Sequence, residues 1–144
     1  MWFAYCCSVR TNASSHPYAV EVDGLVVQYD QITAVNNVSF AARTGKVTVI
    51  LGSNGAGKTS TLEVCEGFRR PTSGSVRVLG FDPRHERGAL NQHMGVMLQD
   101  GGVYPSARVR DVVSHFCALH NKGVNATELV ERVGLSNRST GTWR

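Results

Sequence analysis

The sequence predicts an α/β protein built around a glycine-rich loop between a strand and a helix. Residues 52–59 read Gly-Ser-Asn-Gly-Ala-Gly-Lys-Thr and fit the pattern G-x-x-x-x-G-K-[ST]. Residues 46–51, before the loop, form a β-branched apolar run that is typical of a buried strand. Residues 59–68, after it, place Leu62 and Cys65 on one helical face. Strand, loop and helix in this order are the context that the motif requires.

The residue types of this loop suit the binding of a phosphate chain. Glycines adopt positive φ and let the backbone approach a ligand, so that loop N–H groups and the N-terminus of the following helix face an anion. We expect Lys58 to reach the β- and γ-phosphates and the Thr59 hydroxyl to ligate Mg²⁺. The predicted nucleotide-binding residues of this segment, which Gly52 opens, are Ser53, Asn54, Gly55, Ala56, Gly57, Lys58, Thr59 and Ser60.

The chain before the loop reads as antiparallel β-structure. Residues 1–18 are expected to be a flexible lead-in. Residues 20–29 and 34–42 are strand candidates joined by a turn at Asp30-Gln31, and the first strand is expected to break at Asp23-Gly24. This pattern predicts a β-hairpin in front of the nucleotide core.

The chain after the loop alternates strands and helices. Residues 75–79 and 93–98 are predicted strands, and residues 84–92 a short helix. A loop at residues 99–105 follows, and residues 127–133 predict a helix that Gly134 ends. A further helix, ending near Gly123, has an apolar face made by Val109, Val112, Val113, Phe116 and Leu119.

Composition limits the classes of function. The 144 residues suffice for one domain, and 42% hydrophobic with 18% charged residues is typical of a soluble globular protein. The net charge is +4, but the basic residues are scattered, so a nucleic-acid partner is not expected. The four cysteines and five histidines show no metal-ligand spacing, which favours a reduced intracellular compartment. No apolar run is long enough to span a membrane.

From about Leu25 to Gly134, the sequence resembles the N-terminal part of the ATP-binding subunit of ABC transporters. The glycine-rich loop is close to the form of that family. Tyr29 lies where the family keeps an aromatic residue against adenine. Residues 71–76 and 78–80 look like the strand after the family's loop helix, and Gln99 looks like its Q-loop glutamine.

The resemblance implies an α/β fold: a partial P-loop NTPase core with an N-terminal antiparallel β portion and the start of a helical subdomain. It implies a lead-in at residues 1–18, the core at 19–107 and the subdomain start at 108–144. ATP and Mg²⁺ are the implied cofactors, with Tyr29 stacking on adenine and Gln99 joining Thr59 as a metal ligand. The implied partners are a transmembrane permease and a second ATP-binding subunit. The implied location is cytoplasmic, on the inner face of the cell membrane.

Hydrolysis in this family needs residues that this sequence does not contain. The family places an Asp after four apolar residues and a Glu next to it, and none of the aspartates at 23, 30, 82, 100 and 111 fits. The signature Leu-Ser-Gly-Gly-Gln and a switch histidine are also missing, and the chain ends about where the signature is expected. We therefore predict no catalytic residue and no turnover by this chain alone. We also expect the open edge of the loop strand to promote association.

Three functions stay open from the sequence. The first is the ATP-binding module of a transporter motor, with a loop after Gln99 similar to that of drug or multidrug exporters. The second is a non-catalytic nucleotide-binding fragment or an inert product. The third is another P-loop enzyme such as a small-molecule kinase, which needs a lid arginine cluster and an acidic residue near the acceptor. The sequence shows neither feature at an interpretable place.

Overall fold

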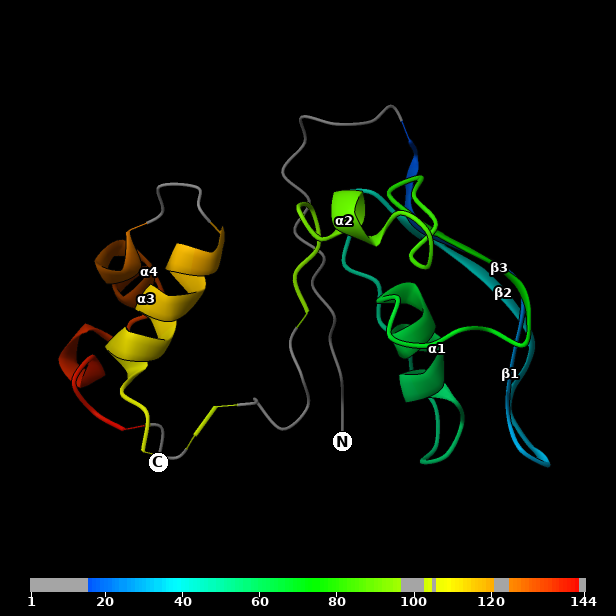
Figure 1. The fold of residues 1–144 in the computed structure, drawn as a ribbon, viewed down its shortest axis with the longest axis horizontal. Coiled ribbons are helices and arrows are strands. Elements are labelled where there is room, and N and C mark those ends of the chain that lie inside the picture. Colours follow the sequence, from blue (N-terminus) through cyan, green and yellow to red (C-terminus); the bar gives the residue numbers. More distant parts are fainter. Residues whose placement is uncertain (1–15, 97–102, 105, 121–124, 143–144) are drawn as a thin grey trace. The chain divides into compact units, whose positions relative to one another are not determined.

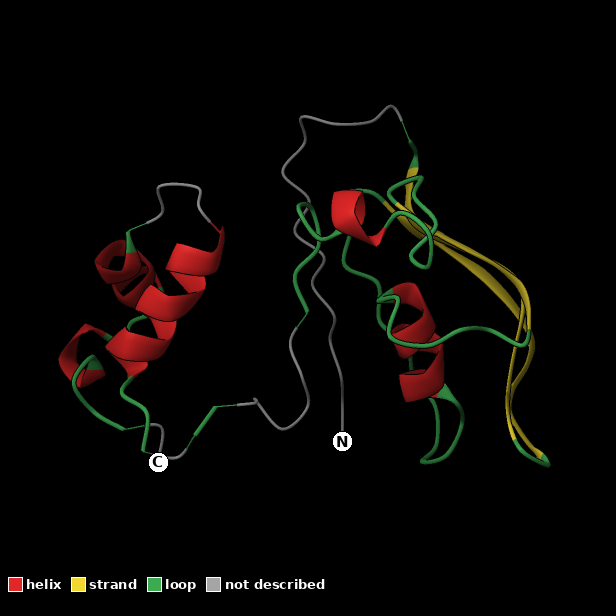
Figure 2. Ribbon diagram, viewed as in Figure 1, coloured by secondary structure: helices red, strands yellow, loops and turns green. Residues whose placement is uncertain are grey.

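The computed structural model describes residues 16–96, 103–104, 106–120 and 125–142. The chain divides into two compact units, one up to Val96 and one from Met97 onward. The first unit holds a sheet and the glycine-rich loop, and the second holds a group of helices (Figures 1 and 2).

Within the described residues, the sheet is antiparallel and contains three strands in the order β2-β1-β3. Strands β1 (Tyr18–Tyr29) and β2 (Ile32–Arg43) form the predicted hairpin, and Asp30 in its turn has a φ of 51°. Strand β1 continues through Gly24, where the predicted break is a shift in register. Strand β3 (Ser73–Val78) pairs with the other edge of β1, at the place where residues 75–79 predict a strand.

One helix packs on this sheet and carries the loop at its start. Helix α1 (Lys58–Cys65) begins after Gly57, where the sequence predicts it. Its buried residues include two hydroxyl side chains, of which Thr61 donates to the carbonyl oxygen of Gly57 at 2.9 Å. Buried hydroxyls of this kind are tolerated when they are hydrogen-bonded. The spacing of apolar residues predicts Leu62 and Cys65 on the buried face of α1. It describes that face incompletely, because the buried residues also include the hydroxyl side chains of Ser60 and Thr61.

The core of the first unit lies between the sheet, α1 and a short helix. Helix α2 (Arg87–Leu90) is shorter than the predicted residues 84–92, but its last residue is fully buried. Full burial of a Leu or Val side chain contributes about 1.5–3 kcal/mol. The most deeply buried aliphatic side chains are Leu25, Val27, Val64 and Leu90.

Residues 46–51, the predicted buried strand before the loop, are not a strand. They contain one isolated bridge residue, Thr48, and the apolar side chains of Val47, Val49 and Leu51 are 66%, 47% and 62% exposed. A strand of this type needs neighbours for its N–H and C=O groups on both sides. The described sheet is antiparallel and does not contain this segment.

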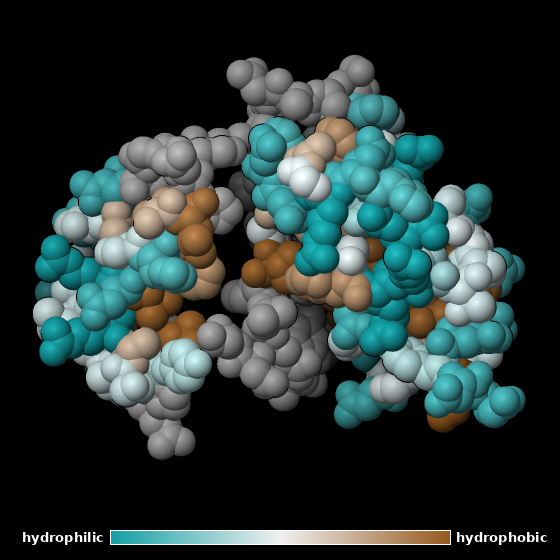
Figure 3. Space-filling view, in the orientation of Figure 1, coloured by the Kyte–Doolittle hydropathy of each residue, from teal (hydrophilic) through white to brown (hydrophobic). Residues whose placement is uncertain are grey.

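The strand predicted at residues 93–98 is not formed in its described part. Residues 91–93 form a turn and residues 94–96 are irregular, while 97 and 98 lie outside the described residues. The physical reason is the same as for residues 46–51, because a central strand also depends on its neighbours. Apolar side chains of the first unit reach the surface between polar ones, as the brown areas of Figure 3 show.

The second unit contains the two helices that the sequence predicts. Helix α3 (Val109–His120) and helix α4 (Ala126–Arg132) pack together, followed by the short helix η1 (Ser136–Arg138). The side chain of Asn125 caps α4 by accepting from the N–H of Thr127 at 2.9 Å, and Gly134 ends it with a φ of 72°. Within the described ranges, no helix has the length and apolar character needed to cross a bilayer.

Candidate nucleotide site

The glycine-rich loop takes its shape from two glycines with left-handed backbone. Gly55 and Gly57 both have a φ of 79°. A Cβ atom at Gly57 would lie 2.3 Å from the carbonyl oxygen of Ala34, whereas one at Gly55 would meet nothing within 4 Å. Gly57 is therefore required both by its backbone angles and by the close approach of β2. This contact anchors the start of α1, and with it the loop, against the hairpin.

Lys58 directs its ammonium group back over the loop. Its Nζ donates to the carbonyl oxygens of Gly52 at 2.9 Å and Ser53 at 2.6 Å. The positive charge therefore lies across the loop and at the N-terminus of α1, where the helix dipole is equivalent to about half a positive charge. Ser53, Asn54, Gly55 and Ala56 are exposed, so ligands can reach the segment. This concentration of positive potential and accessible backbone suits an anionic ligand.

The two hydroxyl residues after Lys58 have different surroundings. Thr59 is exposed in the first turn of α1, where its hydroxyl is accessible to a metal ion beside a bound phosphate. Ser60 is buried, and its Oγ lies 2.8 Å from the hydroxyl oxygen of Tyr29. Ser60 thus connects the loop helix to the end of β1 in this structure, while a role in the phosphate cradle stays a prediction.

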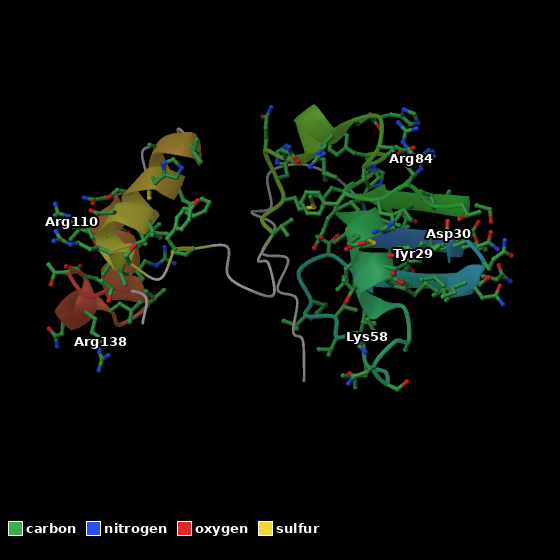
Figure 4. The ribbon with its side chains drawn as sticks, turned by 60° about the horizontal axis from the view of Figure 1, so that its bottom comes forward. Tyr29, Asp30, Lys58, Arg84, Arg110 and Arg138 are labelled. Carbon is green, nitrogen blue, oxygen red and sulfur yellow. The ribbon has the colours of Figure 1, made fainter. Side chains whose placement is uncertain are left out.

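Tyr29 and Lys58 belong to the same unit and flank the first turns of α1 (Figure 4). The side chain of Tyr29 is 37% exposed, so part of its ring is available to a ligand. The guanidinium of Arg69 lies 4.4 Å from the ring centroid. Arg69 in turn donates from Nε to Oε2 of Glu63 at 2.6 Å, and this hydrogen bond raises the pKa of Arg69.

Sequence reasoning did not find Arg69 and Glu63. The two residues lie six positions apart and Arg69 follows the end of α1, so no helical spacing pairs them. Only the turn after α1 brings Arg69 back, since its backbone N–H donates to the carbonyl oxygen of Glu63 at 3.1 Å. A usable signal in the sequence would have been opposite charges around a predicted helix end.

Gln99, the other predicted metal ligand, lies outside the described residues, as does most of the loop at 99–105. In the described ranges, no group of three or more histidine, cysteine or acidic side chains converges to hold a metal ion. Among the described residues, Thr59 is the predicted Mg²⁺ ligand, and this role stays a prediction.

Cys65 lies at the end of α1 but does not act as a nucleophile at neutral pH. Burial raises the pKa of its thiol to about 12, and the neighbouring Glu66 adds to this effect. A thiol with so high a pKa stays protonated, and the thiolate is the reactive form.

Fold and loop together define the class. A glycine-rich loop, the N-terminus of α1 and a lysine over the loop are the features of a P-loop protein. The family model described as ABC transporter matches residues 35–143. The chain belongs to the ABC transporter family, and its predicted fold class, a partial α/β P-loop core, is confirmed by the solved structures that it resembles.

Curated relatives come from several kinds of transporter. The probable multidrug ABC transporter ATP-binding protein YbhF of Escherichia coli is 31% identical over 115 residues, which cover 79% of this chain and 20% of that protein. The methionine import ATP-binding protein MetN of Geobacillus kaustophilus is 35% identical over 118 residues, 74% of this chain and 34% of that protein. This chain thus spans between a fifth and about a third of the length of these relatives.

Solved structures match the fold over most of the chain. The structure of cbiO1 from Clostridium perfringens, part of the ABC transporter complex cbiONQ, has a TM-score of 0.70 at 26% identity and covers 88% of this chain and 55% of that one. The ATP-binding cassette MJ0796, in a dimeric post-hydrolysis state with ADP and Pi, has a TM-score of 0.71 at 18% identity. The match covers 86% of this chain and 61% of that one. The second likeness concerns the fold alone.

Proposed function

We propose that this chain is an ATP-binding component of an ABC transporter and that residues 52–60 hold the phosphates of ATP. The observation that carries this proposal is the placement of the Lys58 ammonium on the loop carbonyls of Gly52 and Ser53, at the N-terminus of α1. These carbonyls are neutral acceptors, and a triphosphate is a stronger partner for an ammonium group. Lys58 therefore exchanges carbonyl contacts for phosphate contacts when ATP binds.

The other proposed site residues contact different parts of the bound ATP and Mg²⁺. Backbone N–H groups from Ser53 to Lys58 face the β- and γ-phosphates, and the Thr59 hydroxyl ligates Mg²⁺. Tyr29 stacks on adenine, which is supported by its partly exposed ring and by its attachment to α1 through Ser60. Aromatic stacking of this kind is worth about 1–3 kcal/mol per base. Bound Mg²⁺ supplies charge neutralisation of the phosphates, and Gln99 is proposed as its second protein ligand.

Transport itself is proposed from the family. The partner is a transmembrane permease, which places the chain at the cytoplasmic face of a membrane, and a second ATP-binding subunit completes a dimer. The relatives act on different cargo, since YbhF is named for multidrug transport and MetN for methionine import. Drug export is therefore one proposal for the cargo, favoured by the loop after Gln99, and import is the alternative.

A second proposal concerns turnover: this chain alone binds ATP without hydrolysing it. It is supported by the sequence, in which no aspartate follows four apolar residues and precedes a glutamate. Phosphate release that depends on magnesium and disappears in Lys58→Ala would contradict this proposal.

Binding is tested by titrating the full chain with ATP and Mg²⁺ in a calorimeter. Lys58→Ala should remove most of the affinity, because a charge-assisted contact to phosphate is worth about 1.5–3 kcal/mol. Lys46→Ala is the matched control, since Lys46 is an exposed lysine on the approach to the loop. Equal affinities for both variants would overturn the proposed site.

A further inference from the structure

Two contacts hold the side chain of Tyr29, and a third holds the arginine that makes one of them. Its hydroxyl oxygen lies 2.8 Å from Oγ of Ser60, and the guanidinium carbon of Arg69 lies 4.4 Å from the ring centroid. Arg69 is itself fixed, because its Nε donates to Oε2 of Glu63 at 2.6 Å. Carboxylate, guanidinium and aromatic ring therefore follow one another along the side of α1.

The groups that contact Tyr29 come from the start of α1 and from the turn after it. Ser60 lies in the first turn, next to the loop, and Glu63 lies three residues further on, about 4.5 Å along the axis. Arg69 follows the end of the helix and reaches the ring from the side of Glu63. The guanidinium thus covers one face of the ring, while Tyr29 as a whole remains 37% exposed, which leaves room for a ligand at this side chain.

We infer that Arg69 is a positioning residue for the nucleobase: it supports the ring of Tyr29 from behind, so that base, ring and guanidinium form a three-layer stack. The inference rests on the proposed function, because it takes Tyr29 as the surface on which the base stacks. A cation over an aromatic face is attracted by the ring electrons, most strongly where water is excluded. A ring that is held before the ligand arrives loses less freedom on binding, which favours affinity.

The test separates the base from the phosphates. The full chain is titrated with ATP and with inorganic tripolyphosphate, each competing with a fluorescent ATP analogue. Arg69→Met keeps an unbranched apolar stem and removes the guanidinium, and it should weaken ATP binding about threefold to tenfold. Tripolyphosphate has no base, so its affinity should not change. Arg70→Met is the matched control, since Arg70 is the exposed neighbour, and it should change neither affinity.

A second variant tests the anchor. Glu63→Gln keeps the shape of the side chain and weakens the charge-assisted hydrogen bond to Arg69. It should reduce ATP affinity by a smaller factor than Arg69→Met and leave tripolyphosphate binding unchanged. Thermal melts of all variants establish that the fold is the same.

Three outcomes would overturn the inference, and they differ in what they say about the proposed phosphate site. Unchanged or tighter ATP binding by Arg69→Met would show that the guanidinium does not support the base, while the proposed phosphate site would stand. If Arg69→Met lost affinity for ATP and for tripolyphosphate by the same factor, Arg69 would act on the folded structure as a whole and not on the base. If the wild-type chain binds tripolyphosphate no better than Lys58→Ala does, the proposed function fails and the inference fails with it.

Discussion

The hairpin and residues 46–51 are both rich in β-branched side chains, yet only the hairpin forms strands. Strands β1 and β2 lie close in sequence and satisfy each other's backbone groups through one turn. Residues 46–51 have no paired strand in the described sheet, and Leu51 is 62% exposed where Leu25 of β1 is fully buried. The comparison teaches that strand propensity is a statement about neighbours as much as about residues.

The largest expected effect compares the same substitution in both regions. Leu25→Ala should lower the free energy of unfolding by about 2–5 kcal/mol, because it leaves a cavity in a closed core. Leu51→Ala should change it by less than about 0.5 kcal/mol, since the side chain is largely exposed. Urea denaturation followed by circular dichroism measures both. Similar losses would mean that residues 46–51 are packed in solution.

The next largest effect concerns the contact between Gly57 of the loop and Ala34 of the hairpin. Gly57→Ala meets the carbonyl oxygen of Ala34 and requires a left-handed backbone, so it should cost about 3 kcal/mol. Gly55→Ala has the same φ but open space around it, and it should cost about 1 kcal/mol. Denaturant midpoints give the difference between the two variants. A larger cost at Gly55 would contradict the contact with β2.

A smaller effect concerns association through the exposed apolar segment. Val49→Lys places a charge in the middle of residues 46–51, where the native side chain is 47% exposed. Exposed apolar side chains promote association between chains, and a charge among them opposes it. Sedimentation velocity should show less self-association at equal concentration, with little change in the melting temperature. Equal or greater association by the variant would argue against a contact through this segment.

The smallest expected effect concerns the protonation of Cys65, which pH and an alkylating reagent can measure. Burial raises the pKa of Cys65 from 9.0 to about 12, so the folded state favours the protonated thiol over the thiolate. Its contribution to stability is fully present below pH 9 and is lost as the pH rises toward 12. At pH 8, Cys65 should therefore react with iodoacetamide much more slowly than the half-buried Cys117 of the second unit. Peptide mapping by mass spectrometry measures the two rates, and equal rates would show that α1 opens readily.

Part of the site followed from sequence because its chemistry is local. A glycine-rich loop, a lysine and a helix N-terminus lie within one short segment, and their spacing alone predicts where the ammonium and the loop meet. The hairpin and helices α3 and α4 followed for the same reason, since turns and caps such as Asn125 act over a few residues. The Arg69–Glu63 support of Tyr29 did not follow, because it joins β1, α1 and the turn after α1.

The sequence by itself determined the loop, its family and the elements that close on near neighbours. Only the tertiary structure decided that residues 46–51 stay outside the described sheet, that Ser60 faces Tyr29 and that Gly57 meets the backbone of Ala34. The physical reason is range: backbone conformation and capping depend on adjacent residues, whereas strand pairing and close packing depend on partners far away in the chain.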